Sequence, residues 1–300
     1  MQINWFPGHM AKAFRNIKEY LAKVDVVIET SDARIPRSSR NPEFSKILSE
    51  KTQRILLLNK ADLADSNVTQ AWIKKLKEDN ILAIESVAKD SSSANRILKE
   101  ASTLVEDKFK KRAEANRGFI PLRIMIVGVP NTGKSTLINN IAQRKTAETS
   151  NRPGVTRGPQ WIKGKDQSVE LLDMPGVLWP KLETYEQKLG LAATGAIKDS
   201  LLPIEEVAYF LFKQLLITYP DELIQRYKIN NFDEHIYDIY LEAARKRGAI
   251  MSGGKVDETR FAKLLLTEYR NGTIGSISLE RPDKTYDFEH INYLSELDLN

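Results

Sequence analysis

Residues 128–135 read GVPNTGKS, and this stretch decides the fold because it fits the phosphate-binding P-loop pattern. It follows the apolar run 124–127 and precedes a helical pattern, which is the context in which such a loop wraps phosphates. The glycines let backbone amides point at the phosphates, while the lysine adds a charge near the β and γ phosphates. We expect six residues to contact a nucleotide here: Asn131, Thr132, Gly133, Lys134, Ser135 and Thr136.

The motif NKAD at residues 59–62 follows the apolar run 55–58 and predicts which base the nucleotide carries. A carboxylate at its last position can accept from both the ring N–H and the exocyclic amine of guanine, whereas adenine lacks this pair of donors. We therefore expect guanine to be bound by Asn59, Lys60, Ala61 and Asp62. Glu85 and Ser86 begin the segment ESVAK, which predicts further contacts to the base, with an ordinary strand end as the alternative.

Two later motifs predict a magnesium site that senses the nucleotide. In DMPG, residues 173–176, Asp173 can hold Mg²⁺ through water while the amide of Gly176 meets the γ-phosphate. Thr156 lies between two glycine-bearing turns in PGVTRG, and we expect it to complete the Mg²⁺ shell. The hydroxyl of Ser135 is the third expected ligand.

The motifs run in rotated order, because the base motif precedes the P-loop whereas Ras-type GTPases have it after the P-loop. Chain ends of compact domains lie close together, so joining the old ends and cutting elsewhere preserves the sheet and the pocket. Short apolar runs alternate with helical patterns between residues 24 and 175, which indicates an α/β domain with a mostly parallel sheet. We expect strands at 24–28, 55–58, 124–127 and 169–172.

Past residue 180 the pattern becomes helical. One helix is expected between Pro203 and Pro220, another ends at Gly248, and a third contains Phe261. The sequence therefore predicts a GTPase domain over residues 1–180, beginning with an amphipathic helix, and a small all-α domain over residues 181–300. A segment from about 176 to 203 is expected to join them.

Composition excludes several classes of protein. The chain has no cysteine, so disulfides and thiolate metal sites are excluded. No apolar run approaches the roughly 20 residues of a membrane-spanning helix, and the first residues do not resemble a signal peptide. These features predict a cytoplasmic protein, and the net charge of +5 favours an anionic partner such as nucleic acid.

The rotated order, with WFPGHMAK at 5–12, DAR at 32–34 and RPGVT at 152–156, resembles the YlqF/RbgA family of bacterial ribosome biogenesis GTPases. The resemblance covers nearly the whole chain, including GAIKD at 195–199 and MSGG at 251–254. It implies a circularly permuted Ras-like P-loop GTPase that acts late in assembly of the large (50S) ribosomal subunit and is activated by that particle. The implied partners are GTP, GDP, the subunit and its rRNA, with neither a membrane nor DNA. The alternative is a Ras-like regulatory switch that binds a protein effector.

The resemblance also bears on catalysis, because Val177 stands where Ras-like enzymes carry the glutamine that orients water. In this family the leading candidate for that role is His9, whose neutral ring can accept a proton from water. A helix cap or an RNA contact is the alternative for His9. Related GTPases use an asparagine at the position of Asn131 to hold potassium, which predicts K⁺-stimulated hydrolysis.

For RNA contact the sequence offers two basic surfaces, although charge runs are often only solvated faces. The helical domain, expected to bind RNA or the ribosome, carries RKR at residues 245–247. The other cluster follows the first half of the chain and consists of Lys108, Lys110, Lys111, Arg112 and Arg117.

Overall fold

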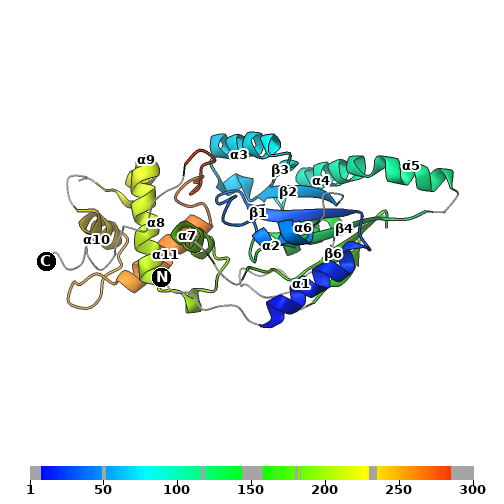
Figure 1. Cartoon of the computed structure of the whole chain (residues 1–300). Helices are drawn as coiled ribbons and strands as arrows, with labels where there is room; N and C mark the ends of the chain where they lie inside the picture. Colours follow the sequence, from blue (N-terminus) through cyan, green and yellow to red (C-terminus); the bar gives the residue numbers. More distant parts are fainter. Residues whose placement is uncertain are drawn as a thin grey trace.

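A six-stranded sheet with the order β3-β2-β1-β4-β6-β5 forms the centre of one half of the molecule (Figure 1). The computed structural model describes residues 8–48, 52–115, 119–143, 158–165, 167–179, 182, 184–229 and 235–284, with side chains from residue 12 onward. All neighbouring strands pair in parallel except β5, which is antiparallel to β6. The strands are β1 Val26–Asp32, β2 Gln53–Asn59, β3 Ala83–Ser86, β4 Leu122–Gly128, β5 Gln160–Lys163 and β6 Val169–Asp173.

The four expected strands are confirmed as β1, β2, β4 and β6, and their register explains the rotated motif order. Asp32 pairs with Asn59, which in turn pairs with Ser86. Gly128 lies opposite Thr30 on the neighbouring strand. Because parallel strands end at the same edge, segments far apart in the chain meet at the carboxyl end of this sheet.

Helices cover both faces of the sheet because apolar side chains of the inner strands point alternately to each side. Val26 and Ile28 face α4 Ser91–Leu104 and α6 Lys134–Ala142. Val27 faces α1 Gly8–Leu21, and α2 Pro42–Ile47 and α3 Ser66–Glu78 cover the rest of that side. Two helices connect β3 to β4, since α4 ends at Leu104 and α5 Glu106–Glu114 begins two residues later.

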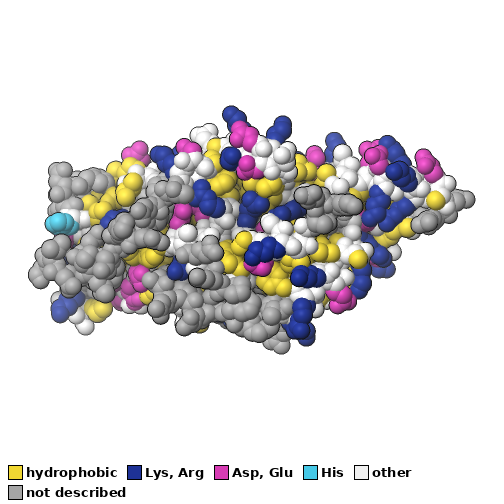
Figure 2. Space-filling view, in the orientation of Figure 1, with side chains coloured by type: hydrophobic (Ala, Val, Ile, Leu, Met, Phe, Trp, Pro, Cys, Tyr) yellow, Lys and Arg dark blue, Asp and Glu magenta, His cyan; other side chains and the backbone are white. Residues whose placement is uncertain are grey.

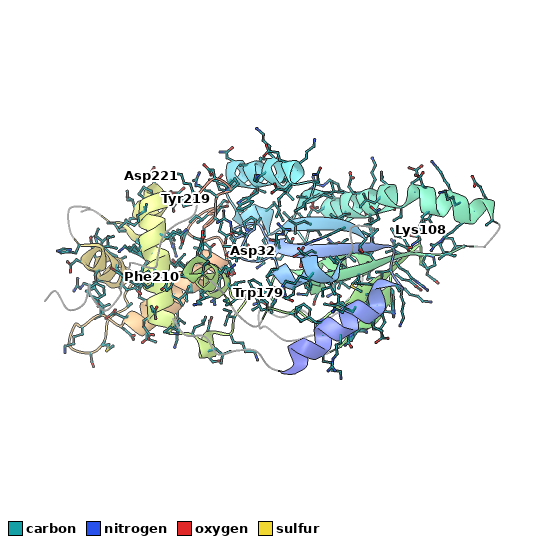
Figure 3. The ribbon with its side chains drawn as sticks, viewed as in Figure 1. Asp32, Lys108, Trp179, Phe210, Tyr219 and Asp221 are labelled. Carbon is teal, nitrogen blue, oxygen red and sulfur yellow. The ribbon has the colours of Figure 1, made fainter. Side chains whose placement is uncertain are left out.

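The second half of the molecule is a group of helices packed around α8 Ile204–Thr218, whose side chains are largely buried. Its interior is rich in edge-to-face aromatic pairs, such as Phe212 with Tyr240 and Tyr240 with Phe261. The surrounding helices are α7 Tyr185–Ala193, α9 Pro220–Tyr227, α10 Ile236–Lys246 and α11 Glu258–Arg270. Figure 3 shows Phe210 and Tyr219 on this side, away from Lys108 at the far end of the sheet.

Two expectations about this half need correction. The segment expected to join two domains contains α7, which packs in the same buried cluster as α8 because Leu189, Leu191 and two alanines face inward. Pro220 ends α8 as expected, but it also begins α9. Proline suits the first position of a helix, where no amide donor is needed, so one residue separates two helices.

The two halves are in direct contact. The buried cluster of the helical half includes Ile35 and Val129 from the sheet half. Residues 276–281 return to the sheet half, where the amide of Ile277 donates to the Leu63 carbonyl at 3.0 Å. None of the helices in the described part of the chain is long and apolar enough to cross a membrane.

Candidate nucleotide-binding site

The P-loop leaves β4 at Gly128 and enters α6 after Gly133, and both positions require glycine. Gly128 has φ +149°, and a Cβ there would lie 2.5 Å from the Thr30 carbonyl oxygen. Gly133 has φ +90°, and a Cβ there would lie 2.1 Å from Asn59 Nδ2. The loop is also tied to β1, since the hydroxyls of Thr30 and Thr132 lie 2.6 Å apart. Close backbone packing therefore determines the shape of the loop.

Asn59 joins the base-reading motif to the P-loop. Its Nδ2 donates to the Thr132 carbonyl at 2.6 Å, and its Oδ1 accepts from the Ala88 amide at 3.0 Å. The side chain is almost fully buried. Asn59, which the sequence predicts to bind guanine, thus positions two loops with its side chain, and both polar atoms of that side chain are engaged with protein groups.

The aliphatic stem of Lys60 lies beside the cavity while its amine pairs with Asp32. Lys60 Nζ is 2.9 Å from Asp32 Oδ2, and Arg34 binds the same carboxylate through Nε at 2.9 Å and NH2 at 2.8 Å. Burial by itself raises the pKa of Asp32, but the two cations outweigh it and hold that pKa far below its usual range. Arg34 also donates to the Tyr269 carbonyl of α11 at 3.2 Å. This ion-pair cluster links the base motif to the helical half.

Asp62 presents an exposed carboxylate to the cavity from the short turn Ala61–Leu63. Among the residues that the structure describes, no group binds this carboxylate. Val87, Ala88 and Lys89 line the same cavity. An acceptor with no protein partner, held at a cavity wall, is suited to two adjacent N–H donors of a base.

Glu85 and Ser86 lie beside this wall and do not line the cavity. Glu85 Oε2 accepts from Gln70 of α3 at 2.9 Å, and Ser86 is buried at the end of β3. The strand end itself is confirmed, since β3 covers Ala83–Ser86. The three residues after it supply the wall.

Lys134 is the cation at the phosphate end of the site. Its Nζ donates to the Val129 carbonyl at 2.8 Å, and burial lowers its pKa to about 8, against the opposing charge of Asp173. A Cβ on Gly176 would lie 2.9 Å from this amine, so the DMPG segment lies directly against the P-loop. Ser135 is the second residue of α6, and the next residue, Thr136, lines the cavity.

Val177 is fully buried and packs with Met174 against Ala13 and Ile17 of α1. Its amide donates to the Gly128 carbonyl at 3.2 Å. The residue at the usual glutamine position therefore belongs to the core and docks the first helix on the DMPG segment. His9 lies in the first turn of that helix, where its side chain is outside the described residues, as is the whole of Thr156.

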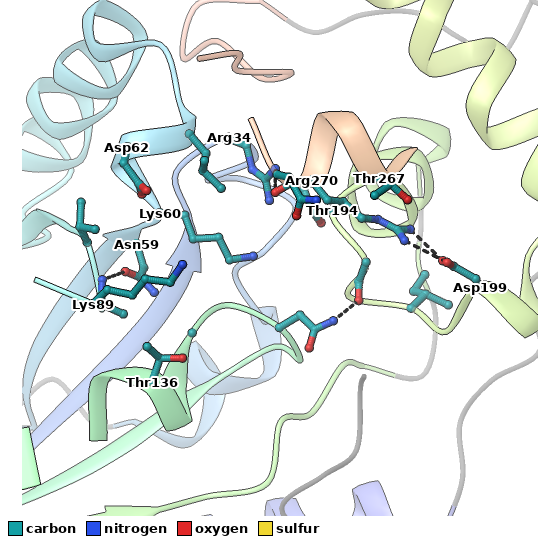
Figure 4. Close-up of a pocket in the computed structure, with 18 of the residues that line it drawn as sticks. Arg34, Asn59, Lys60, Asp62, Lys89, Thr136, Thr194, Asp199, Thr267 and Arg270 are labelled. Atoms are coloured by element: carbon teal, nitrogen blue, oxygen red, sulfur yellow. Dashed lines mark hydrogen bonds and ion pairs between the residues drawn. The ribbon is translucent and has the colours of Figure 1, made fainter. Parts of the chain in front are cut away.

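The cavity measures about 1020 Å³ and has a second wall from the helical half. Figure 4 shows Asn59, Lys60, Asp62 and Lys89 on one side, with Thr194, Asp199, Thr267 and Arg270 on the other. Thr136, in the first turn of α6, lies below Lys89 on the first of these sides. The base motif and the helical half thus face one cavity.

Gly195 is the point where the P-loop contacts this second wall. Asn131 Nδ2 donates to the Gly195 carbonyl at 2.5 Å, and Gly195 has φ +77°. Arg270 holds the same turn through the carbonyls of Ala192 and Ala193 and pairs with both oxygens of Asp199. The P-loop asparagine is therefore joined directly to the helical half by a hydrogen bond.

The second wall was not found by sequence reasoning. GAIKD at 195–199 was noted only as part of a family resemblance, and Thr267 and Arg270 carry no motif. A glycine with a lysine three residues after it, Gly195 and Lys198, was the one local signal available. Among the described residues there is no cluster of three histidine, cysteine or carboxylate side chains able to hold a metal ion by itself.

Residues 123–247 match the family model described as "50S ribosome-binding GTPase", which begins at the P-loop strand and leaves out the preceding base motif. A ribosome biogenesis GTPase A from Priestia megaterium is 45% identical over 95% of this chain and 98% of the relative.

Two solved structures are similar to this chain. A GDP-bound YlqF is 27% identical, with a TM-score of 0.64 over 89% of this chain and 99% of that chain. GNP-bound YlqF from T. maritima is 26% identical, with a TM-score of 0.60 over 91% of this chain and all of the other. The chain belongs to the ribosome biogenesis GTPase A family of circularly permuted GTPases.

Proposed function

We propose that the chain binds GTP in this cavity, hydrolyses it to GDP and phosphate, and thereby drives a late step in assembly of the large (50S) ribosomal subunit. The observation that carries the proposal is the meeting of the exposed Asp62 carboxylate, the P-loop and the DMPG segment at one edge of the sheet. The family match and the names of the relatives support the ribosomal role.

In this proposal Asp62 reads guanine, and the P-loop with Lys134 binds the phosphates. The pKa of about 8 leaves Lys134 largely protonated at neutral pH, so it can exchange its carbonyl partners for phosphate oxygens. Gly176 is close enough to Lys134 that its amide can report the γ-phosphate to the chain that follows it.

Magnesium is the expected cofactor, and the donor set fits it. Asp173 ends β6 next to the P-loop strand, with Ile126 as its register partner, and Ser135 lies in the first turn of α6. Together with Thr156 these oxygen groups would hold Mg²⁺, the remaining ligands coming from phosphate and water. When bound, the ion neutralises charge on the phosphates.

For hydrolysis we propose that His9 orients the attacking water. The supporting observation is that α1, which contains His9, packs through Ala13 and Ile17 on the segment containing Val177. His9→Ala should leave GTP affinity unchanged and slow particle-stimulated hydrolysis by about tenfold or more. A wild-type rate in this variant would assign His9 to a cap or an RNA contact.

Potassium stimulation is proposed through the side-chain oxygen of Asn131. The amide nitrogen is held by Gly195, which orients this side chain at the edge of the P-loop. Steady-state turnover in potassium should exceed turnover in sodium at equal ionic strength. Equal rates would remove potassium from the proposal.

The proposed partners are the large subunit and its rRNA, in the cytoplasm, with a division near residue 180 between the GTPase part and a ribosome-binding helical part. The test is sedimentation of the protein, loaded with a non-hydrolysable GTP analogue, together with ribosomal subunits. Hydrolysis is then measured with isolated large subunits and with a protein fraction free of RNA. Stimulation by the protein fraction alone would instead indicate a Ras-like regulatory switch.

A further inference from the structure

An exposed tryptophan lies on the edge strand of the sheet. Trp161 of β5 is 38% exposed, whereas Trp72 and Trp179 are buried. Its register partner is Leu172, whose own partner is Met125, and both pack against α1. Trp161 therefore lies on the α1 face of the sheet, at the margin that α1 leaves open.

Aromatic and cationic side chains surround this ring. Tyr20 from the end of α1 meets Trp161 edge to face, with ring centroids 6.4 Å apart. The Arg123 guanidinium lies 5.6 Å from the Trp161 ring, and Lys23 Nζ lies 4.3 Å from the Tyr20 ring. Lys163, two residues along β5, is also exposed. We call these five residues the Trp161 surface.

The charge around the Trp161 surface is net positive, because its three cations, Lys23, Arg123 and Lys163, face two carboxylates. Glu19 pairs with Lys23 at 3.2 Å and Glu170 pairs with Arg123 at 2.9 Å. The buried carboxylate of Asp25 is neutralised by Lys108 at 2.6 Å and by Arg112. Figure 2 shows lysine and arginine side chains over the end of the molecule where α5 lies, and Figure 3 places Lys108 there. Lys108 and Arg112 of α5 therefore meet the start of β1 at the amino end of the sheet, where the Arg123 amide also donates to Asp25 at 3.0 Å.

We propose that the Trp161 surface binds single-stranded RNA, with one base stacked on Trp161 and phosphates paired with Lys23, Arg123 and Lys163. This inference rests on the proposed ribosomal function and names one of its contacts. An exposed aromatic ring bordered by cations is the arrangement with which proteins bind unpaired bases, because every base has a stacking face and every linkage a charge.

The proposed RNA contact and the nucleotide cavity are separate places on the molecule. The nucleotide cavity lies at the carboxyl ends of the parallel strands, where Asp32 is found, and Lys108 marks the opposite end (Figure 3). Both ends border α1, whose inner side packs on the DMPG segment and whose last turn carries Tyr20. RNA bound at Tyr20 is therefore one helix away from the segment that contacts the P-loop.

The first test measures the affinity of the full chain for a short oligoadenylate. Trp161→Leu should weaken binding about tenfold, the scale of one lost base–aromatic stack, while Trp161→Phe should stay close to wild type. Both variants should bind GTP normally, which establishes that the fold is intact. Binding should quench the fluorescence of Trp161 in the wild type, and this part of the quenching should be missing in Trp161→Phe.

The second test compares matched charge changes. Lys23→Gln and Lys163→Gln should each lower the magnitude of the slope of log affinity against log salt concentration by roughly 0.7. The same changes at the exposed Lys74 and Lys77 of α3, beside the opposite edge of the sheet, should leave the slope unchanged.

The inference is wrong if Trp161→Leu binds oligoadenylate as tightly as the wild type, or if the wild type does not bind it. It is also wrong if the variant loses binding to the ribosomal particle without a change in oligonucleotide affinity, since that result indicates a protein partner. Failure of the proposed function is distinguishable, because the wild type would then show no stimulation by large subunits whatever its affinity for the oligonucleotide.

Discussion

The stability of this protein is expected to fall as pH rises toward neutrality, because of one buried carboxyl group. Glu280 is 1% exposed and accepts from the amides of Arg37, at 2.6 Å, and Ser38, at 3.1 Å. Burial raises the pKa of Glu280 from 4.5 to about 7, and the nearby charge of Glu186 adds to this against the opposing hydrogen bonds. The carboxyl group therefore retains its proton in the folded chain well above the pH at which it loses it in the unfolded chain.

The sign and the size follow from this difference. Between pH 4.5 and about 7 the folded chain binds more protons at Glu280 than the unfolded chain does, so the free energy of unfolding decreases with increasing pH. The loss is complete above the folded pKa and amounts to about 3 kcal/mol, at about 1.4 kcal/mol for each pH unit. Below the unfolded pKa this group has no effect on the pH dependence.

Glu280→Gln tests this reasoning because glutamine stays neutral and its carbonyl oxygen can accept from the same amides. We expect the unfolding free energy of the variant, relative to wild type, to increase by about 2–3 kcal/mol between about pH 5 and pH 8. Urea denaturation followed by tryptophan fluorescence measures it, with Trp72 as a local reporter, since its Nε1 donates to the Glu280 carbonyl at 3.1 Å. Glu78→Gln, at an exposed position, is the control. A difference between Glu280→Gln and wild type that does not change with pH would refute the assignment.

Three further predictions concern the site and its link to the helical half. Asn59→Ala leaves two buried backbone groups without their hydrogen-bond partner. The free energy of unfolding, measured by urea denaturation, should therefore fall by about 2–4 kcal/mol. An unchanged free energy of unfolding would contradict the bridging role. Gly195→Ala should lower the melting temperature more than Gly248→Ala, because both have positive φ but only Gly195 faces close neighbours; equal losses would argue against that packing. Arg34→Met should cost about 3–5 kcal/mol in unfolding free energy, and adding Asp32→Asn should recover part of it if the cost arises from an unpaired buried charge.

Sequence reasoning identified the sheet because its inner strands are short apolar runs buried on both faces. It missed β5, since an edge strand with three exposed residues in QWIK has no apolar run to detect. It also read Gly176 to Pro203 as a connecting segment, although Leu189 and Leu191 make α7 part of the helical core. The sequence of α7, YEQKLGLAA, contains a glycine and two alanines and few large apolar residues, so its helical pattern is weak.

The same limit applies within the site. The structure places Asp62 at the cavity wall and Lys134 at the start of α6, and each belongs to a motif with a fixed place at a strand end. Asn59 was expected to contact the base, whereas its side chain bridges two loops, and a local motif contains no information about which groups another segment presents to it. Whether these residues bind nucleotide stays a prediction.

The sequence by itself determined the P-loop, the guanine motif and their rotated order, since these depend on local backbone geometry and on spacing along the chain. Only the tertiary structure decided that the helical half forms a second wall of the cavity, with Gly195 against Asn131 and Arg34 against Tyr269. Such contacts join residues 64 and 235 positions apart, so no local pattern encodes them. They arise because parallel strands bring distant segments to one edge, and burial of apolar surface then presses the helices against that edge.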